Sequence, residues 1–150
     1  MANEQTLVLC KPDAVQRGCV GRIVSRFEQK GLKIAGMKML HMDEALANRH
    51  YQEHLEKVFY PQLRDFITSS PVIALAIEGD NAVEIVRALM GTTNPQNAAP
   101  GTIRGDFGID LTKNLVHGSD SPASAEREIG LFFDKSELHD YEMTIKEWLE

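Results

Sequence analysis

An α+β fold with an antiparallel sheet is predicted by the kinds of segment in this 150-residue chain and by their order along it. Short apolar runs have the length of buried strands, and segments with apolar residues at helical spacing lie between and after them. The 43% of hydrophobic and 25% of charged residues are ordinary globular values. The length suits one domain over residues 1–150, with enough chain to bury a core.

The predicted strands are bounded by turn and helix signals rather than by a strict alternating pattern. They cover residues 6–10, 32–42, 72–77 and 115–117. Pro12 ends the first strand, since proline restricts the residue before it and cannot donate to a sheet. The second run is the weakest of the four because it is rich in methionine.

The predicted helices combine apolar spacing with recognisable ends. They cover residues 18–31, 43 to about 55, 61–67, 80–91, 121 to about 133, and a short stretch near 141–149. Asp43, Asp80 and Ser121 are suited to cap the starts, and Gly31 and Gly91 to close the ends.

A long loop separates the predicted helix 80–91 from the last predicted strand. Residues 92–108 are rich in proline, glycine, asparagine and threonine, and are too many for a simple connection, so we interpret them as a functional loop. Without the extra helices, the element order is β-α-β-β-α-β, the split pattern of ferredoxin-like folds. The sequence therefore predicts an antiparallel sheet covered by helices.

Charge and cysteine content exclude several classes. The net charge of −6 argues against a dedicated nucleic-acid partner. Cys10 and Cys19 cannot form a disulfide framework, and no segment resembles a signal peptide or a membrane span. These observations predict a cytoplasmic protein with no membrane association.

One histidine stands in a setting that suits phosphate chemistry. Residues 114–121 read Asn-Leu-Val-His-Gly-Ser-Asp-Ser, so His117 follows an apolar run and precedes a helix start. A helix start offers free N–H groups and positive potential to a phosphate, and imidazole is a competent nucleophile. Glu128, two turns into that helix, could orient the ring, and Ser119 could donate a hydrogen bond. His117 is therefore our candidate phosphoryl acceptor.

Several basic and polar residues could accompany that histidine. Lys11, Arg87 and Arg104 stand at or near predicted element ends, and Thr93 and Asn114 add neutral hydrogen-bonding groups. Phosphoryl transfer depends on positioning and on stabilising dispersed negative charge, for which guanidinium groups are suited. Arg104 is the strongest candidate, because glycines on both sides let the backbone approach a ligand.

The segment 50–54, His-Tyr-Gln-Glu-His, matches the H-x-x-E-H zinc signature. On one helix, His50 and His54 would share a face, as two zinc ligands require. A zinc enzyme also needs a third protein ligand, and the surrounding sequence offers no clear one. We therefore favour two exposed helix histidines as the interpretation of this segment.

One further residue could take part in nucleotide recognition, and two common nucleotide-binding motifs are absent from the sequence. Phe59 follows a predicted helix end, where a core role is usual and stacking on a nucleobase is the alternative. The sequence contains neither a G-x-x-x-x-G-K-[ST] loop nor a G-x-G-x-x-G fingerprint. A P-loop or Rossmann nucleotide site is therefore disfavoured.

Taken together, these motifs resemble nucleoside diphosphate kinase almost from end to end. The segments that carry the resemblance are residues 11–18, 91–95, 100–107, 114–121 and 124–129. The resemblance implies a ferredoxin-like fold and a ping-pong reaction, in which a nucleoside triphosphate such as ATP gives its γ-phosphoryl group to His117 and a diphosphate removes it. It also implies Mg²⁺ carried by the nucleotide phosphates rather than held by protein ligands. A homo-oligomer is implied as well, most often a hexamer, with a tetramer or dimer as alternatives.

Carried over by position, the resemblance implies a role for each site residue. The residues that would surround the phosphates and the nucleophile are Lys11, Tyr51, His54, Arg87, Thr93 and Arg104. Those that would reach the sugar hydroxyls are Lys11 and Asn114. Those that would enclose the base are Phe59 and Leu111, and those that would hold His117 are Glu128 and Ser119.

One departure from the family pattern bears on nucleotide binding. The family usually reads His-x-x-Arg-Pro-Phe, where this chain has Lys57 and Val58 before Phe59. Loss of the proline frees the segment that presents Phe59, and loss of the arginine weakens any bidentate pair. We predict intact chemistry with weaker nucleotide binding or altered subunit contacts.

Two functions outside phosphoryl transfer remain as rivals. The first is a non-catalytic ligand-binding or scaffolding domain on the same fold, which the full set of catalytic-type residues disfavours. The second is an RNA-binding ferredoxin-like domain. Residues 6–11 lack the aromatic stacking pattern expected of such a sheet, so this alternative is weaker.

Overall fold

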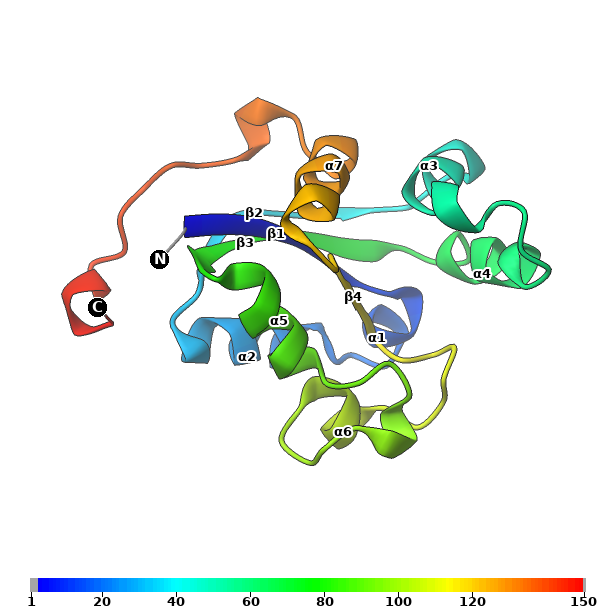
Figure 1. The fold of residues 1–150 in the computed structure, drawn as a ribbon, viewed down its shortest axis with the longest axis horizontal. Coiled ribbons are helices and arrows are strands. Elements are labelled where there is room, and N and C mark those ends of the chain that lie inside the picture. Colours follow the sequence, from blue (N-terminus) through cyan, green and yellow to red (C-terminus); the bar gives the residue numbers. More distant parts are fainter. Residues whose placement is uncertain (1–2, 150) are drawn as a thin grey trace.

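A computed structural model describes residues 3–149 of the chain. Four strands form one antiparallel sheet in the order β2-β3-β1-β4 (Figure 1). Their bounds are β1 Asn3–Cys10, β2 Lys33–Leu40, β3 Val72–Asp80 and β4 Val116–Gly118. Because β1 lies between β3 and β4, the shortest strand pairs with the buried end of β1, Val8–Cys10.

The helices follow the sheet in the order β1-α2-β2-β3-α5-β4. The α-helices are α1 Pro12–Gln16, α2 Val20–Lys30, α3 Glu44–His50, α4 Tyr60–Ile67, α5 Ala82–Met90, α6 Ile103–Phe107 and α7 Pro122–Phe132. Short 3₁₀ turns are η1 Gln52–His54, η2 Pro95–Asn97, η3 Lys135–Glu137 and η4 Lys146–Trp148. The predicted β-α-β-β-α-β arrangement with extra helices is confirmed.

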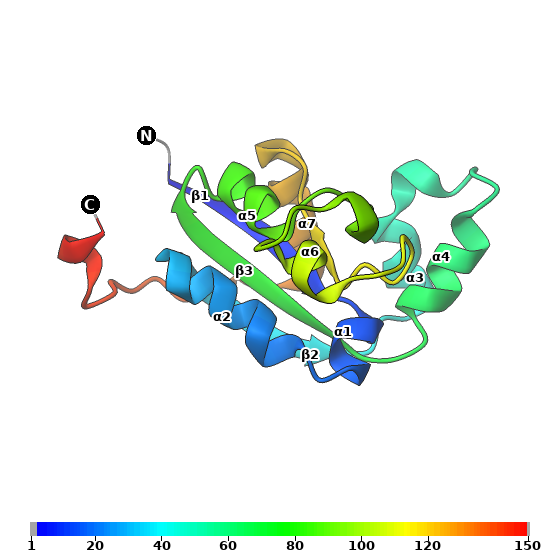
Figure 2. The same cartoon turned by 90° about the horizontal axis from the view of Figure 1, so that it is seen from below.

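Both faces of the sheet are covered, which explains the apolar runs in the central strands. Val8 and Cys10 pack in the cluster that contains α2 and α5, and Leu7 and Leu9 pack in the cluster that contains α3, α4 and α7. All four side chains are fully buried. Figures 1 and 2 show α2 and α5 together on one side of the sheet and α7 on the other. Alternate residues of β1 therefore supply two separate cores.

Two predicted helix boundaries are wrong for local backbone reasons. The helix expected to continue to Leu55 ends at His50, and only a 3₁₀ turn follows Tyr51. Asp80 is the last residue of β3, and Asn81 takes the N-cap position with a positive φ of 56°. Asparagine tolerates this left-handed conformation better than most residues, which explains the shift by one position.

Three further segments differ from the prediction. Pro12 does end β1, but it also occupies the first turn of the unpredicted helix α1, where its missing N–H costs nothing. The loop 92–108 contains η2 and α6, whose start Thr102 caps through a hydrogen bond to the Gly105 amide. The helix expected near 141–149 is only η4, in a tail that follows the edge strand β2, where the His139 amide donates to the Ala35 carbonyl oxygen at 2.8 Å. That tail has no buried residue to form a helical packing face.

Within the described residues 3–149, every helix is too short or too polar to cross a membrane.

Candidate active site

The pairing of β4 with β1 decides which way His117 points. His117 lies directly opposite Leu9, and paired residues of an antiparallel ladder project to the same face. That face is covered by α3 and α7, whereas Val116 packs in the opposite core. The imidazole is therefore directed toward the helices that carry His50 and Glu128.

Glu128 contacts the ring of His117, and Ser119 contacts Glu128. His117 Nε2 lies 2.7 Å from Glu128 Oε1, and Ser119 Oγ donates to the same oxygen at 3.0 Å. Arg127 lies close to the other carboxylate oxygen, with Nη2 3.7 Å from Oε2. An ionised carboxylate only accepts hydrogen bonds, so Nε2 carries the proton and Nδ1 keeps a lone pair.

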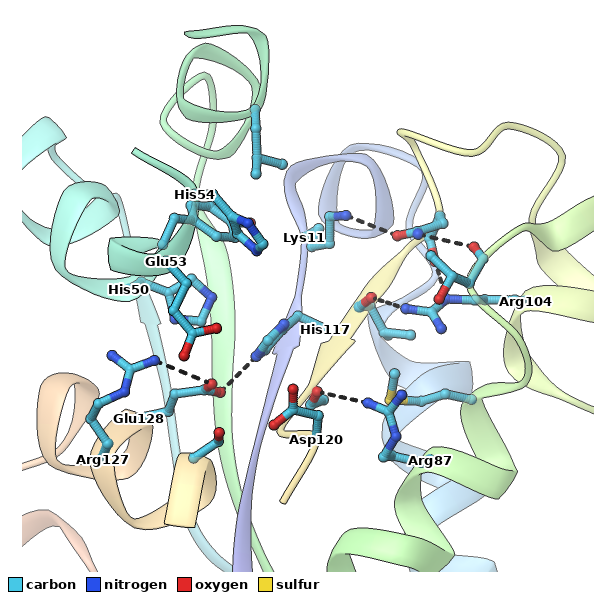
Figure 3. A pocket seen from close by; sticks show the side chains of 18 residues that line it. Lys11, His50, Glu53, His54, Arg87, Arg104, His117, Asp120, Arg127 and Glu128 are labelled. Atoms are coloured by element: carbon cyan, nitrogen blue, oxygen red, sulfur yellow. Dashed lines mark hydrogen bonds and ion pairs between the residues drawn. The ribbon is translucent and has the colours of Figure 1, made fainter. Parts of the chain in front are cut away.

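A cavity of about 290 Å³ opens beside His117, whose side chain is 25% exposed. Figure 3 shows His117 between Glu128 and Arg127 on one side and Arg87 and Arg104 on the other. The predicted site residues that line the cavity are Lys11, Tyr51, His54, Arg87, Thr93, Arg104, Asn114, His117 and Glu128. Ser119 does not line it, because its buried side chain lies behind Glu128.

Lys11 is a buried cation at the end of β1. Its Nζ donates to Asn114 Oδ1 at 2.8 Å and to the Thr112 carbonyl oxygen at 3.3 Å. Burial lowers the pKa of Lys11 to about 8; nearby Asp13 opposes the shift and Arg104 adds to it. The lysine is therefore charged at neutral pH but loses its proton more readily than an exposed lysine.

Arg104 is fixed by three backbone carbonyls. It donates to the carbonyl oxygens of Gly91 at 3.0 Å, Asn114 at 3.3 Å and Val116 at 2.7 Å. Burial lowers its pKa to about 10, with a smaller effect from Arg87, so the guanidinium remains charged at neutral pH. A side chain on the following residue would meet the backbone of residue 99, since a Cβ at Gly105 would lie 2.0 Å from the Ala99 oxygen. This glycine lets the loop close over the arginine.

The remaining polar predictions meet at the same wall of the cavity. Asn114 Nδ2 donates to the Thr93 carbonyl oxygen at 3.1 Å, which ties the long loop to the start of β4. Arg87 Nη1 lies 3.4 Å from the Gly118 carbonyl oxygen, next to His117. Three segments distant in sequence therefore supply one polar wall.

The segment 50–54 does not contain two exposed helix histidines, and that interpretation is wrong. His50 is only 4% exposed, and its ring centroid lies 4.6 Å from that of His117. His54 follows in η1 and its Nδ1 lies 2.9 Å from Lys57 Nζ. Because α3 ends at His50, the two histidines do not share a helix face.

His50 and Tyr51 are both shaped by burial. Burial holds the pKa of His50 well below its usual range, with a further lowering by His117 and Arg127. Burial also raises the pKa of Tyr51, so its hydroxyl stays protonated. Both rings are therefore neutral at the edge of the cavity.

Asp13 is a functional position that the sequence did not reveal. Its Oδ2 accepts a hydrogen bond at 3.0 Å from the amide of Leu115, which has a positive φ of 76°. The carbonyl oxygen of Leu115 in turn accepts from the amide of Lys11 at 2.9 Å. Such a φ is rare and strained for a leucine, so these bonds hold the backbone two residues before His117. The only sequence signal is the position of Asp13 beside Lys11.

Phe59 and Leu111 lie outside the cavity lining. Phe59 is 51% exposed at the start of α4, and Leu111 is 56% exposed in the loop before β4. The ring centroid of Phe59 lies 5.9 Å from that of His54, so the phenylalanine is linked to the cavity through a lining residue.

Comparison with known proteins identifies relatives over nearly the whole chain. Residues 4–138 match the family model described as nucleoside diphosphate kinase. The nucleoside diphosphate kinase of Natronomonas pharaonis is 57% identical over 97% of this chain and 96% of its own length. That of Archaeoglobus fulgidus is 56% identical, with 97% of each chain covered.

Solved structures agree with this match. A halophilic nucleoside diphosphate kinase from Halobacterium salinarum in complex with CDP has a TM-score of 0.97 and 52% identity, with 99% of each chain covered. A nucleoside diphosphate kinase family protein from Babesia bovis has a TM-score of 0.95 and 43% identity, covering 98% of this chain and 99% of its own. The chain therefore belongs to the nucleoside diphosphate kinase family of phosphotransferases.

Proposed function

We propose that this protein transfers the γ-phosphoryl group of a nucleoside triphosphate to a nucleoside diphosphate through a phosphohistidine at Nδ1 of His117. The contact that carries the proposal is the 2.7 Å hydrogen bond between His117 Nε2 and Glu128 Oε1. It leaves the Nδ1 lone pair available for attack, on a ring that is partly exposed in a cavity lined by cations.

Each half-reaction exchanges one bond at phosphorus. The Nδ1 lone pair attacks the γ-phosphorus, the bond to the bridging oxygen breaks, and the diphosphate departs with the bond's electron pair. The ring becomes positively charged as it is phosphorylated, and the Glu128 carboxylate stabilises that charge. A second nucleoside diphosphate then attacks the phosphohistidine in the reverse direction. Lys11, Arg87 and Arg104 stabilise the negative charge on the phosphates.

The residues present fit a Mg²⁺ ion that is carried by the nucleotide. Within residues 3–149, the one group of three or more candidate ligand side chains contains two histidines, whereas Mg²⁺ prefers oxygen ligands. Mg²⁺ carried by the nucleotide would neutralise part of the phosphate charge.

The nucleotide would be held along the cavity from phosphate to base. Tyr51, His54 and Thr93 lie where they could contact the phosphates, and Lys11 and Asn114 form the pair that would meet the sugar hydroxyls. Phe59 and Leu111 would enclose the base. The CDP bound by the Halobacterium salinarum relative supports a nucleoside diphosphate as one substrate.

The proposal also includes the domain content, the cellular location and the oligomeric state of the enzyme. We expect one nucleoside diphosphate kinase domain over residues 1–150, located in the cytoplasm, where the unpaired thiols of Cys10 and Cys19 would stay reduced. We also expect a homo-oligomer, most simply a hexamer. The edge strand β2 supports association, since Met37 and Met39 on it are exposed. Multi-angle light scattering measures the subunit number directly.

Labelling with [γ-³²P]ATP tests the reaction. The protein should acquire an acid-labile, base-stable label that a nucleoside diphosphate removes. His117→Ala should abolish the label, and His139→Ala, which removes an exposed histidine, should keep it. If the wild type takes no label but still binds nucleotides, the protein is a binding domain instead. A label that survives in His117→Ala would assign the phosphoryl group to another residue.

A further inference from the structure

His50 is a buried polar residue that the proposed reaction leaves without a role. Its ring is only 4% exposed, and neither ring nitrogen has a hydrogen-bond partner. Buried polar groups are almost always paired, so each unpaired one requires an explanation. An imidazole with two free nitrogens at the edge of a cavity is suited to bind a metal ion.

Three elements bring His50 together with two other metal-binding groups. His50 ends α3, His117 lies in β4 and Glu128 lies in α7, and Figure 3 shows all three side chains gathered at the same end of the cavity. One ligand atom from each lies within 4.8 Å of the others. The H-x-x-E-H segment therefore contributes only its first histidine, and the other two ligands come from distant parts of the chain.

Two imidazoles and one carboxylate are a ligand set that Zn²⁺ prefers, with water in a fourth position. Ligand atoms of a tetrahedral zinc site lie about 3.3 Å apart. The observed separations, all within 4.8 Å, would have to close by at most about 1.5 Å, within reach of side-chain rotation.

We propose that His50, His117 and Glu128 form a Zn²⁺ site, and that Zn²⁺ bound there inhibits phosphorylation of His117. The inhibition, unlike the binding, rests on the proposed function. If Zn²⁺ binds Nε2, the single proton of the neutral ring is left on Nδ1. If it binds Nδ1, it uses that lone pair directly. In both cases His117 has no lone pair for attack on phosphorus, so the metal and the phosphoryl group exclude each other.

The surrounding charges restrict which ions can bind. Lys11 and Arg127 face the same group of side chains and repel any cation. Mg²⁺ binds imidazole weakly and would not overcome that repulsion, whereas Zn²⁺ gains from both histidines. The site is therefore selective for zinc-like ions over the magnesium that accompanies nucleotides.

Metal binding without nucleotide tests the site itself. Calorimetric titration of the wild type with ZnCl₂ should give one ion per chain, and Co²⁺ should give the visible absorption of a tetrahedral centre. His50→Phe, which keeps the aromatic packing against Phe132, and His50→Gln should each bind Zn²⁺ about tenfold more weakly or worse. His139→Gln, a remote and exposed control, should bind as the wild type does. Wild-type affinity in both His50 variants, or equally tight binding of MgCl₂, would refute the site.

Labelling with [γ-³²P]ATP at fixed total ATP then tests the inhibition. Added ZnCl₂ should reduce the wild-type label, and a chelator should restore it. The His50 variants should need at least about tenfold more Zn²⁺ for the same reduction, which separates binding at the site from chelation of ATP. Equal inhibition of wild type and variants would overturn the claim that Zn²⁺ bound at this site inhibits phosphorylation of His117. A wild type that takes no label in zinc-free buffer would instead refute the proposed function, and the titration would still decide whether the site binds zinc.

Discussion

The two ends of the candidate nucleotide site are built in different ways. At the end that would hold the phosphates and the sugar, called here the phosphate end, the side chains of Lys11, Arg104 and Asn114 are buried and are tied to the backbone and to each other. At the base end, formed by Phe59 and Leu111, half-exposed side chains stand on the first residues of a helix and on a loop. The protein thus fixes its charges and leaves its apolar contacts adjustable.

This difference fits the physical requirements of the two ends. Charges that stabilise a transition state act best when they are held in place beforehand, because they then need no reorganisation during the reaction. Stacking on a nucleobase tolerates different bases, since each base offers a π-face. A fixed phosphate end with an adjustable base end is the arrangement expected of an enzyme that accepts several nucleotides.

The largest effect is expected from Arg104→Ala, which removes a buried cation from the phosphate end. We expect kcat/KM to fall about 10³-fold, because a guanidinium that stabilises a transferring phosphoryl group is lost. Three backbone carbonyls also lose their donor, which should lower the free energy of unfolding by about 1–3 kcal/mol. Steady-state kinetics and urea denaturation measure the two effects.

Arg26→Ala is the matched control for that substitution. Arg26 also bonds the long loop, through the Gly101 carbonyl oxygen at 2.8 Å and Asp106 Oδ2 at 2.7 Å, but its side chain is 28% exposed. We expect a loss of less than about 1 kcal/mol and near-normal activity. If the two variants lost the same activity and the same stability, the burial of Arg104 would not explain its importance at the phosphate end.

The pH dependence of kcat/KM tests the role of the Lys11 charge at the same end, with a smaller expected effect. The pKa of about 8 means that Lys11 is charged below this pH and neutral above it. Once the charge is lost, phosphates bind less well, so kcat/KM should fall by up to about tenfold per pH unit above pH 8. In Lys11→Arg the fall should move to higher pH, since arginine keeps its proton. An unchanged profile in that variant would assign the fall to another group.

At the base end, Phe59→Ala should raise KM about fivefold with little change in kcat. The ring is half exposed, so we expect the lower part of the 1–3 kcal/mol range found for base stacking. Leu55→Ala removes a comparably exposed apolar side chain nearby and should change neither constant. An equal fall in kcat would show that Phe59 also positions the reacting groups.

The smallest effect is expected when the family pattern is restored before Phe59. Val58 is fully exposed, and the Lys57 ammonium lies beside Nδ1 of His54 and over the ring of Phe59. Proline stiffens a compatible segment by about 0.4–1 kcal/mol, so Lys57→Arg with Val58→Pro should lower KM by about threefold. An unchanged KM would remove the idea that this departure weakens nucleotide binding.

Much of the architecture follows from local patterns in the sequence. The buried runs of β1 and β3 and the caps at Asp43 and Ser121 depend on neighbouring residues only, and they lie where they were predicted. Helix α1 was not predicted because Pro12 signals the end of a strand as strongly as the start of a helix. The tail helix failed because propensity without a packing partner does not fold a short segment.

For the candidate site, the sequence predicted which residue types take part better than it predicted which of them are buried. The spacing of His117 and Glu128 on a strand and the following helix was enough to predict their contact. The link between Asp13 and Leu115 depends on a strained backbone that no local pattern signals. The burial of His50 against His117 requires the packing of α3 beside α7, which only the tertiary structure supplies.

The central position of β1 has a consequence for how the chain folds during synthesis. Val8–Cys10 pair with Val116–Gly118, so one edge of β1, the first strand to be synthesised, stays open until most of the polypeptide has left the ribosome. Such distant pairing slows folding and leaves an unprotected strand edge that other chains can join. Ribosome-bound chains that stop before residue 116 should therefore aggregate or recruit chaperones more readily than chains that extend past α7.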